Sequence, residues 1–254
     1  MTAIRADGLY KCYERRNWRG RVVESVEAVR GISFEVRPGE MAAFLGANGA
    51  GKSTTLRLLS GVLTPTRGEA SICGHRSGTP EAAMRFGFVS GNRSLLWSHM
   101  TVRQSLEIIG AIYGLRAAER RERIAALARE LDLEGFLGRR GGTLSLGERM
   151  RCEMAAAVLH RPAVLLADEP TLGLDIPTRW ALRDLLRGWT RASGITLLLT
   201  SHDAGDIESL CERTLLIAQG QLVFDGPTAT LESQAGSLEE SLARHMGEQL
   251  GERR

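Results

Sequence analysis

The stretch "GANGAGKST", residues 46–54, has the residue types and spacing of a loop that binds a phosphate chain. Its glycines let the backbone curl around phosphate oxygens, a lysine brings positive charge to the β and γ phosphates, and a serine hydroxyl can bind Mg²⁺. An apolar strand precedes the loop and a helix follows it, which is the context that this chemistry requires. The expected nucleotide-binding residues are Gly46, Asn48, Gly49, Ala50, Gly51, Lys52, Ser53 and Thr54.

Two carboxylates end the apolar stretch "AVLLADEP", residues 163–170. Asp168 can hold Mg²⁺ through water, and Glu169 can orient or deprotonate the water that attacks the γ-phosphate. An Asp-Glu pair after a strand is more often a helix cap or a solvated strand end. The preceding phosphate loop and the following proline favour the catalytic pair here.

A histidine ends a third apolar stretch, "LLLTSHDAG", residues 197–205. A lone histidine at a strand end is usually structural. Parallel strands would, however, bring His202 to the same edge of the sheet where ligands bind, and there it can donate a hydrogen bond to the γ-phosphate.

A second phosphate-binding feature lies in "TLSLGERMRCEMAAAVLH", residues 143–160, and it contains no lysine. The short Ser-Leu-Gly turn begins an Ala-rich helix, whose free N–H groups and positive dipole end can hold a phosphate. Ser145 and Glu148 also have the spacing of a capping box, and both roles can hold because the cap leaves other N–H groups free. One chain therefore carries a complete phosphate site and an incomplete one.

The apolar patterning predicts an α/β protein around these motifs. After residue 94 the helical period dominates, with a Thr101/Gln104 capping box and then an amphipathic helix over 117–133. The Arg-rich residues 14–26 are expected to form an extended hairpin or a loop. Strands are predicted at 4–13, 29–36, 41–46, 69–74 and 85–90 and a helix at 52–63, followed by alternating strands and helices to the hairpin at 214–226.

The predicted architecture is a mostly parallel α/β core with an N-terminal antiparallel β layer. A helical sub-domain, about residues 91–160, is inserted into this core, and the single domain covers residues 1–236. Residues 237–254 have leucines at four-residue spacing and are expected to form an amphipathic C-terminal helix.

Composition limits the class of protein. The 254 residues are 43% hydrophobic and 25% charged, with a net charge of +3 and no cluster of basic residues, so nothing indicates binding to nucleic acid. Four cysteines without pairing or metal-ligand spacing indicate reduced thiols in the cytoplasm. No apolar run has the ~18 residues of a membrane span, so work at a membrane would require a partner.

In their order along the chain, these motifs resemble the ATP-binding subunit of ATP-binding-cassette (ABC) transporters over residues 3–228. "GANGAGKST" resembles the Walker A loop and "AVLLADEP" the Walker B strand. "LSLGE", residues 144–148, resembles the family signature LSGGQ, "LGLD", residues 172–175, the D-loop, and His202 the switch histidine. Tyr13 stands where the family stacks an aromatic ring on adenine. The signature about twenty residues before "DEP" is the most specific part.

The resemblance implies a P-loop NTPase fold and a head-to-tail dimer with a second copy of the chain. The signature of one copy would close over the ATP of the other, which explains a second phosphate site without lysine. Lys52, Glu169 and His202 would be catalytic, and Ser53 and Asp168 would hold Mg²⁺. The residues that would reach the partner's ATP are Ser145, Leu146, Gly147, Glu148 and Asp175.

The chain departs from the family where a glutamine is expected to reach Mg²⁺ and the attacking water. Gly91 occupies that position and Asn92 follows it. Asn92 carries the same amide on a shorter side chain and is the expected substitute, as an ATP and Mg²⁺ contact. The alternative is that Gly91-Asn92 is only a turn. Trp97 is expected to face a membrane partner.

The resemblance therefore implies an Mg-dependent ATPase that drives separate membrane-spanning permease subunits, most similar to bacterial exporters, at the cytoplasmic face of the inner membrane. The alternative from a different class is a soluble ABC ATPase of iron–sulfur cluster assembly. The transported substrate is chosen by subunits that this sequence does not contain.

Overall fold

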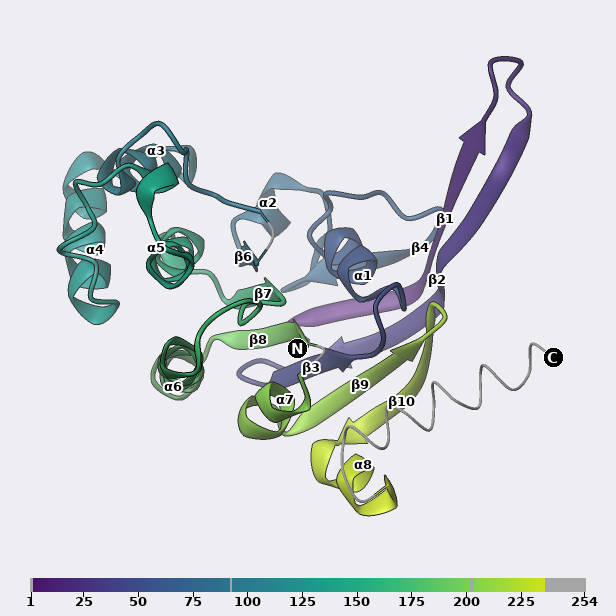
Figure 1. Cartoon of the computed structure of the whole chain (residues 1–254). Coiled ribbons are helices and arrows are strands. Elements are labelled where there is room, and N and C mark those ends of the chain that lie inside the picture. Colours follow the sequence, from purple (N-terminus) through teal and green to yellow (C-terminus); the bar gives the residue numbers. More distant parts are fainter. Residues whose placement is uncertain (1, 92, 202, 236–254) are drawn as a thin grey trace.

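The computed structural model describes residues 2–91, 93–201 and 203–235. Asn92, His202 and the predicted C-terminal helix, residues 237–254, lie outside the described residues. The described chain forms two sheets with helices packed around them (Figure 1). No helix in these ranges has the length and hydropathy needed to cross a bilayer.

The larger sheet carries the core of the protein. Its order is β10-β9-β3-β8-β7-β6, parallel except for the antiparallel pairing of β10 with β9. β7 and β8 are buried along their whole length, as strands in a sheet covered on both faces should be. The strands are β3 (Met41–Leu45), β6 (Phe86–Ser90), β7 (Val164–Asp168), β8 (Thr196–Ser201), β9 (Arg213–Ala218) and β10 (Gln221–Pro227).

Alternate residues of these strands enter two separate hydrophobic cores. In β3, Phe44 packs with α1 and the antiparallel sheet, whereas Ala43 and Leu45 pack with the other helices. This two-residue period follows from the pleat, which points successive side chains to opposite faces. The helices around the sheet are α1 (Lys52–Leu59), α2 (Pro80–Ala83), α6 (Ile176–Ser193), α7 (Ala204–Leu210) and α8 (Thr228–Ala235).

The smaller, antiparallel sheet has the order β2-β1-β4-β5. Its two long strands continue beyond the sheet as a two-stranded hairpin, which projects from the body of the molecule in Figure 1. The Arg-rich segment, expected to be a hairpin or a loop, is thus a hairpin. The strands are β1 (Ile4–Arg16), β2 (Val22–Val36), β4 (Arg67–Ile72) and β5 (His75–Arg76).

Three helices lie between β6 and β7: α3 (Val102–Ile112), α4 (Ala117–Glu130) and α5 (Leu146–Val158). The capping box that begins α3 is confirmed, because the Thr101 and Gln104 side chains each accept the other's backbone N–H at 3.1 and 2.9 Å. A short 3₁₀ turn, η1 (Gly141–Thr143), precedes α5. The mixed α/β fold predicted from sequence is confirmed.

Two predicted helix ends were wrong. α1 ends at Leu59 rather than residue 63, because Gly61 has φ +74° and turns the chain. α4 ends at Glu130 rather than residue 133, because Asp132 adopts φ +52°. The short α2 and β5 and the helix α8 were not predicted.

Candidate active site

The phosphate loop connects β3 to α1 and is shaped by its glycines. Gly46 has φ +154°, and a Cβ there would lie 2.2 Å from the Ile217 carbonyl oxygen. Gly51 has φ +110°, and a Cβ there would lie 2.5 Å from the Ala28 carbonyl oxygen. Both positions therefore need glycine for conformation and for space. No side chain caps the N-terminus of α1, so its first N–H groups remain available to a phosphate.

Lys52 lies inside the curl of this loop and is only 5% exposed. Its Nζ donates to the carbonyl oxygens of Gly46 at 2.5 Å and Ala47 at 3.1 Å. Burial lowers the pKa of Lys52, and the charges of Glu169 and Asp168 act in the opposite direction. The ammonium group thus lies within electrostatic range of both carboxylates predicted to be functional.

Ser53 and Asp168 come from different elements and meet directly. Ser53 Oγ donates to Asp168 Oδ1 at 2.8 Å, and Thr200 Oγ1 donates to the same oxygen at 2.8 Å. Sequence analysis missed Thr200, whose position follows from the pairing of Asp168 with Thr200 across β7 and β8. A hydroxyl and a buried carboxylate are hard oxygen donors, which fit Mg²⁺ that keeps water and phosphate as its other ligands.

Glu169 is held by its backbone just beyond the end of β7. Its N–H is directed at Thr200, with Oγ1 at 3.0 Å and the carbonyl oxygen at 3.2 Å. Glu169 has φ +51°, a left-handed conformation that is costly for a residue with a side chain and that clusters at functional sites. The strand end therefore fixes the direction in which the Glu169 carboxylate leaves the sheet.

Gly91 lies against this same turn. Its N–H donates to the Asp168 carbonyl oxygen at 3.0 Å, and a Cβ on Gly91 would lie 2.6 Å from the Glu169 carbonyl oxygen. A glutamine, which the family resemblance leads one to expect here, would not fit. Any side-chain amide in this segment must therefore come from a neighbouring position, and Asn92 lies outside the described residues.

The signature turn, residues 145–148, is capped as predicted. Ser145 Oγ accepts the Glu148 N–H at 3.3 Å, and Glu148 Oε2 accepts the Ser145 N–H at 2.8 Å. Arg139 also forms an ion pair with Glu148 at 2.8 Å. These hydrogen bonds, led by the one from the Ser145 backbone, lower the pKa of Glu148. These contacts hold the backbone of the turn, and Ser145 itself is exposed to solvent.

The D-loop segment packs beside the signature turn. A Cβ on Gly173 would lie 3.0 Å from Leu146 Cδ2, and one on Gly147 would lie 3.0 Å from Thr178 Cγ2. Asp175 caps α6 by accepting the Thr178 N–H at 2.8 Å, and this hydrogen bond lowers the pKa of Asp175. The structure thus brings the residues predicted to act on a partner's ATP into one neighbourhood.

The predicted residues form two clusters rather than one. Within the described chain, no hydrogen bond or ion pair joins the signature turn to the phosphate loop. Tyr13 lies apart on β1, 40% exposed, with Lys11 Nζ 5.4 Å from the centre of its ring. The residues that converge around the phosphate loop are Gly46, Lys52, Ser53, Asp168 and Glu169.

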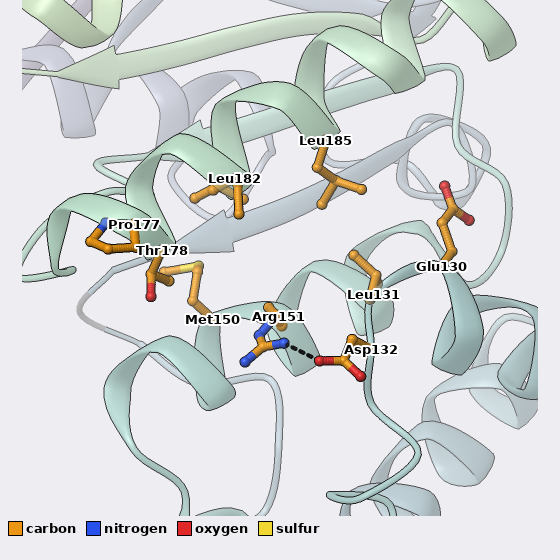
Figure 2. Close-up of a pocket in the computed structure, with 10 residues that line it drawn as sticks. Glu130, Leu131, Asp132, Met150, Arg151, Pro177, Thr178, Leu182 and Leu185 are labelled. Carbon is orange, nitrogen blue, oxygen red and sulfur yellow. Dashed lines mark hydrogen bonds and ion pairs between the residues drawn. The ribbon is translucent and has the colours of Figure 1, made fainter.

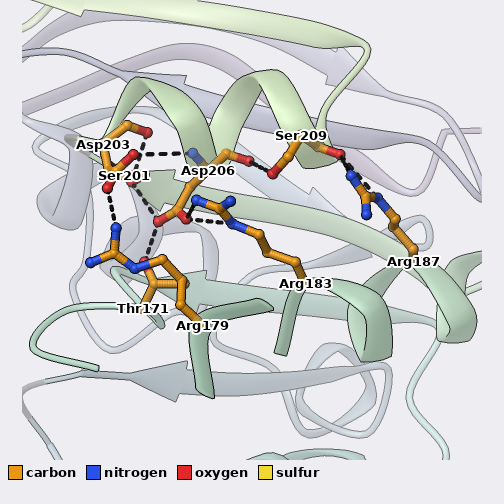
Figure 3. A network of polar contacts seen from close by, with 8 residues as sticks. All are labelled: Thr171, Arg179, Arg183, Arg187, Ser201, Asp203, Asp206 and Ser209. Carbon is orange, nitrogen blue, oxygen red and sulfur yellow. Dashed lines mark hydrogen bonds and ion pairs between the residues drawn. The ribbon is translucent and has the colours of Figure 1, made fainter. Parts of the chain in front are cut away.

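A buried polar network fixes the chain on both sides of position 202 (Figure 3). Asp206 forms an ion pair with Arg183 and accepts hydrogen bonds from Thr171 and, at 3.4 Å, from Ser201. Asp203 forms an ion pair with Arg179. The network was not predicted, although the arginines of α6 recur every four residues and so share one face.

An apolar cavity of about 360 Å³ lies beside the signature turn (Figure 2). The end of α4 and the first turns of α5 form one side, where Arg151 forms an ion pair with Asp132 at 3.0 Å. The other side is α6, through Leu182 and Leu185. The seam between the helical insertion and the α/β core is therefore incompletely packed at this point.

Comparisons with known proteins agree with this arrangement. The family model described as "ABC transporter" matches residues 29–172. The ABC transporter ATP-binding protein NatA of Bacillus subtilis is 33% identical over 81% of this chain and 84% of its own length. The Nod factor export ATP-binding protein I of Paraburkholderia xenovorans is 38% identical over 82% of this chain and 69% of its own.

Solved structures of ABC transporter ATP-binding subunits are also similar to this chain. A structure titled as the ATP binding subunit of an ABC transporter covers 96% of this chain and 100% of its own, with a TM-score of 0.81 and 27% identity. A bacterial ABC transporter cassette solved as a dimer covers 89% of this chain and 98% of its own, with a TM-score of 0.78 and 25% identity.

Proposed function

The chain belongs to the ABC transporter family of ATP-binding proteins and is an ABC-type ATPase, and we propose that it powers substrate translocation by separate membrane-spanning subunits. Export is the proposed direction, because relatives at 37–38% identity are named for the export of Nod factor. The proposed location is the cytoplasmic face of the cell membrane, where the partner subunits would hold the chain.

We propose that the phosphate-loop cluster carries the hydrolysis. Lys52 would exchange its two carbonyl contacts for the β- and γ-phosphates, and Glu169 would accept a proton from the attacking water. Ser53 and Asp168 would hold Mg²⁺, which offsets phosphate charge when it is bound. Thr200 would act as a positioning residue, because its hydroxyl contacts both Asp168 and the Glu169 backbone.

The signature turn would act on the ATP of a second copy. Its separation from the chain's own phosphate loop and the exposure of Ser145 support a head-to-tail dimer. The N-terminus of α5 would then supply N–H groups and a positive dipole to a γ-phosphate that already has the partner's lysine. Mixing two inactive variants tests this arrangement, as described in the Discussion.

The proposal of a membrane partner depends on an exposed apolar groove. A hollow of about 430 Å³ lies between the chain after β6 and the end of α3. Exposed patches of this kind mark sites of protein interaction. Leu95 and Trp97 on one side and Ile112 on the other are large, exposed hydrophobic residues. We propose that an apolar segment of the membrane subunit occupies this groove.

Glu153 connects the groove to the signature helix. It lies on α5, is buried, and accepts hydrogen bonds from Ser94 Oγ and from the Leu95 N–H at 2.7 Å. Because α5 begins at the signature turn, we propose that α3–α5 form a sub-domain that moves as one body. The cavity beside α6 leaves room for such a movement.

Purification of the full chain from native membranes in detergent tests the partner proposal. The expected result is co-purification of an integral membrane protein that Ile112→Arg abolishes. Val62→Arg is the matched control, since Val62 is 68% exposed and Ile112 70%, and Val62 lies outside the groove. Both variants should keep the basal ATPase rate. Capture of only soluble proteins, or equal loss in both variants, would overturn the proposal.

A further inference from the structure

The hairpin formed by β1 and β2 has a distal part, residues 14–24, that we call the arm. Its strands pair as far as Arg16 with Val22, whereas the third strand, β4, pairs with β1 only as far as Tyr10. The arm therefore has two strands, no third neighbour and no hydrophobic core. Figure 1 shows it projecting from the body at the upper right of the view, at the opposite end of the molecule from α3.

The tip of the arm, residues 17–21, is a defined turn. Asn17 Oδ1 accepts the N–H groups of Arg19 and Arg21, both at 3.0 Å. The Asn17 N–H donates to the Arg21 carbonyl oxygen at 2.9 Å, and Gly20 supplies the left-handed conformation with φ +74°. The side chains at the tip are thus presented by a pre-organised backbone.

Charge along the arm is distributed unevenly. Arg15 pairs with Glu24 at 3.0 Å and Arg16 with Glu14 at 2.6 Å, so the two arginines below the tip are neutralised. At the tip itself, Arg19 and Arg21 have no carboxylate within ion-pair distance among the described residues. The only unpaired charge on the arm is therefore positive and lies at its end.

An exposed tryptophan accompanies this charge. Trp18 is 87% exposed, and the Arg19 guanidinium lies 4.5 Å from the centre of its ring. Val22 and Val23, which follow the tip, are about half exposed. A tryptophan beside unpaired arginines combines an amphipathic ring, which favours the headgroup level of a bilayer, with cations that anionic lipids attract.

We propose that the tip of the arm binds anionic phospholipid headgroups at the membrane surface. Trp18 inserts at the headgroup level while Arg19 and Arg21 contact phosphate groups. This proposal rests on the proposed function in one respect: the membrane-spanning subunits bring the chain to a membrane. The lipid contact alone is weak. Once the membrane subunits bind the chain, the tip has a high effective concentration at the membrane surface, so the lipid contact increases the overall affinity of the chain for the membrane.

The experiment uses the purified full chain and vesicles of equal parts phosphatidylglycerol and phosphatidylcholine, with pure phosphatidylcholine vesicles as the reference. Co-sedimentation should favour the anionic vesicles and weaken as salt rises. The Arg19→Gln/Arg21→Gln variant should lose about fivefold for each arginine, roughly 25-fold in all. Trp18→Ala should lose about tenfold.

Two matched controls separate the tip from general effects. Trp180→Ala removes another exposed tryptophan, 60% exposed, on α6. The Arg116→Gln/Arg121→Gln variant removes the same two charges from the start of α4. Both should bind anionic vesicles as wild type does. All variants should keep the wild-type ATPase rate, which distinguishes this test from a failure of the proposed function.

Equal binding of wild type to anionic and neutral vesicles at low salt would overturn the proposal, as would equal losses in the tip and control variants. The chain could instead bind neutral vesicles only when they contain the membrane subunit, with the tip variants abolishing that binding. The partner of the tip would then be protein and not lipid, and the proposal would be overturned. Preferential binding of the tip to single-stranded RNA over anionic vesicles would also overturn it.

Discussion

Replacing Gly91 by alanine should uncouple ATP binding from hydrolysis. The added Cβ would lie 2.6 Å from the Glu169 carbonyl oxygen, so one of the two groups must move by about 0.8 Å to reach an ordinary contact. Gly91 is tied to the Asp168 carbonyl oxygen by its own N–H, which resists its withdrawal. The displacement should therefore fall on Glu169, already in a left-handed conformation.

The magnitude follows from this displacement. A shift of about 1 Å in a catalytic group can lower turnover by about 10²-fold, and the overpacking should cost about 1–3 kcal/mol in the free energy of unfolding. Lys52 binds the carbonyl oxygens of Gly46 and Ala47 within its own loop, and neither contact depends on the Glu169 carbonyl group. The ATP dissociation constant should therefore stay within about twofold of wild type. The measurements are kcat for ATP hydrolysis, ATP binding by calorimetry, and urea unfolding.

Gly188→Ala is the matched control. Gly188 lies within α6, where an added Cβ meets no atom within 4 Å, so alanine should leave kcat unchanged and stabilise the helix by up to about 1 kcal/mol. A Gly91→Ala enzyme that keeps kcat within threefold of wild type would refute the reasoning. Equal losses of ATP affinity and turnover would refute it as well, because the damage would then reach the phosphate loop.

Three further predictions follow from the same geometry. Glu169→Gln should retain ATP affinity and lose at least ~10²-fold in kcat, measured by phosphate release; unchanged hydrolysis would remove Glu169 from the role of base. Mixing Lys52→Ala with Ser145→Arg chains should restore ATPase activity, because each heterodimer keeps one intact composite site, and activity no higher than in the separate variants would contradict the dimer. Burial raises the pKa of Glu153, so ionisation of its carboxyl group in the folded state lowers the stability of wild type as pH rises. Urea unfolding should therefore show that the Glu153→Gln variant becomes more stable relative to wild type between pH 5 and pH 8. A stability difference that does not change with pH would contradict this.

The fold was largely predictable because its signals are local. Apolar strands, glycines in the phosphate loop and the capping boxes at Thr101 and Ser145 depend on neighbours in the sequence, and the structure confirms these elements. Helix ends were less predictable, because Gly61 and Asp132 end helices through backbone conformations that several residue types can adopt.

The candidate site was only partly predictable for a different reason. Thr200 lies in the apolar run "TLLLTS" and looks like an ordinary strand residue until the parallel register places it opposite Asp168. The steric demand at Gly91 depends on a carbonyl group 78 positions away in sequence. Contacts between distant segments of this kind are set by topology, which no local pattern contains.

The position of Glu153 has a mechanical consequence for coupling. Glu153 lies eight positions after Ser145, which caps the same helix, so the two lie roughly 12 Å apart along the helix axis at 1.5 Å per residue. The carboxylate holds the chain that lines the apolar groove, and the first turn of the same helix carries the proposed contact to ATP. A packed helix does not compress over this length, so a displacement imposed at the groove must either move the signature turn or break the hydrogen bonds to Glu153. We expect the first outcome, because the second would leave a buried carboxylate without partners, whereas the cavity beside α6 leaves space for a rigid shift.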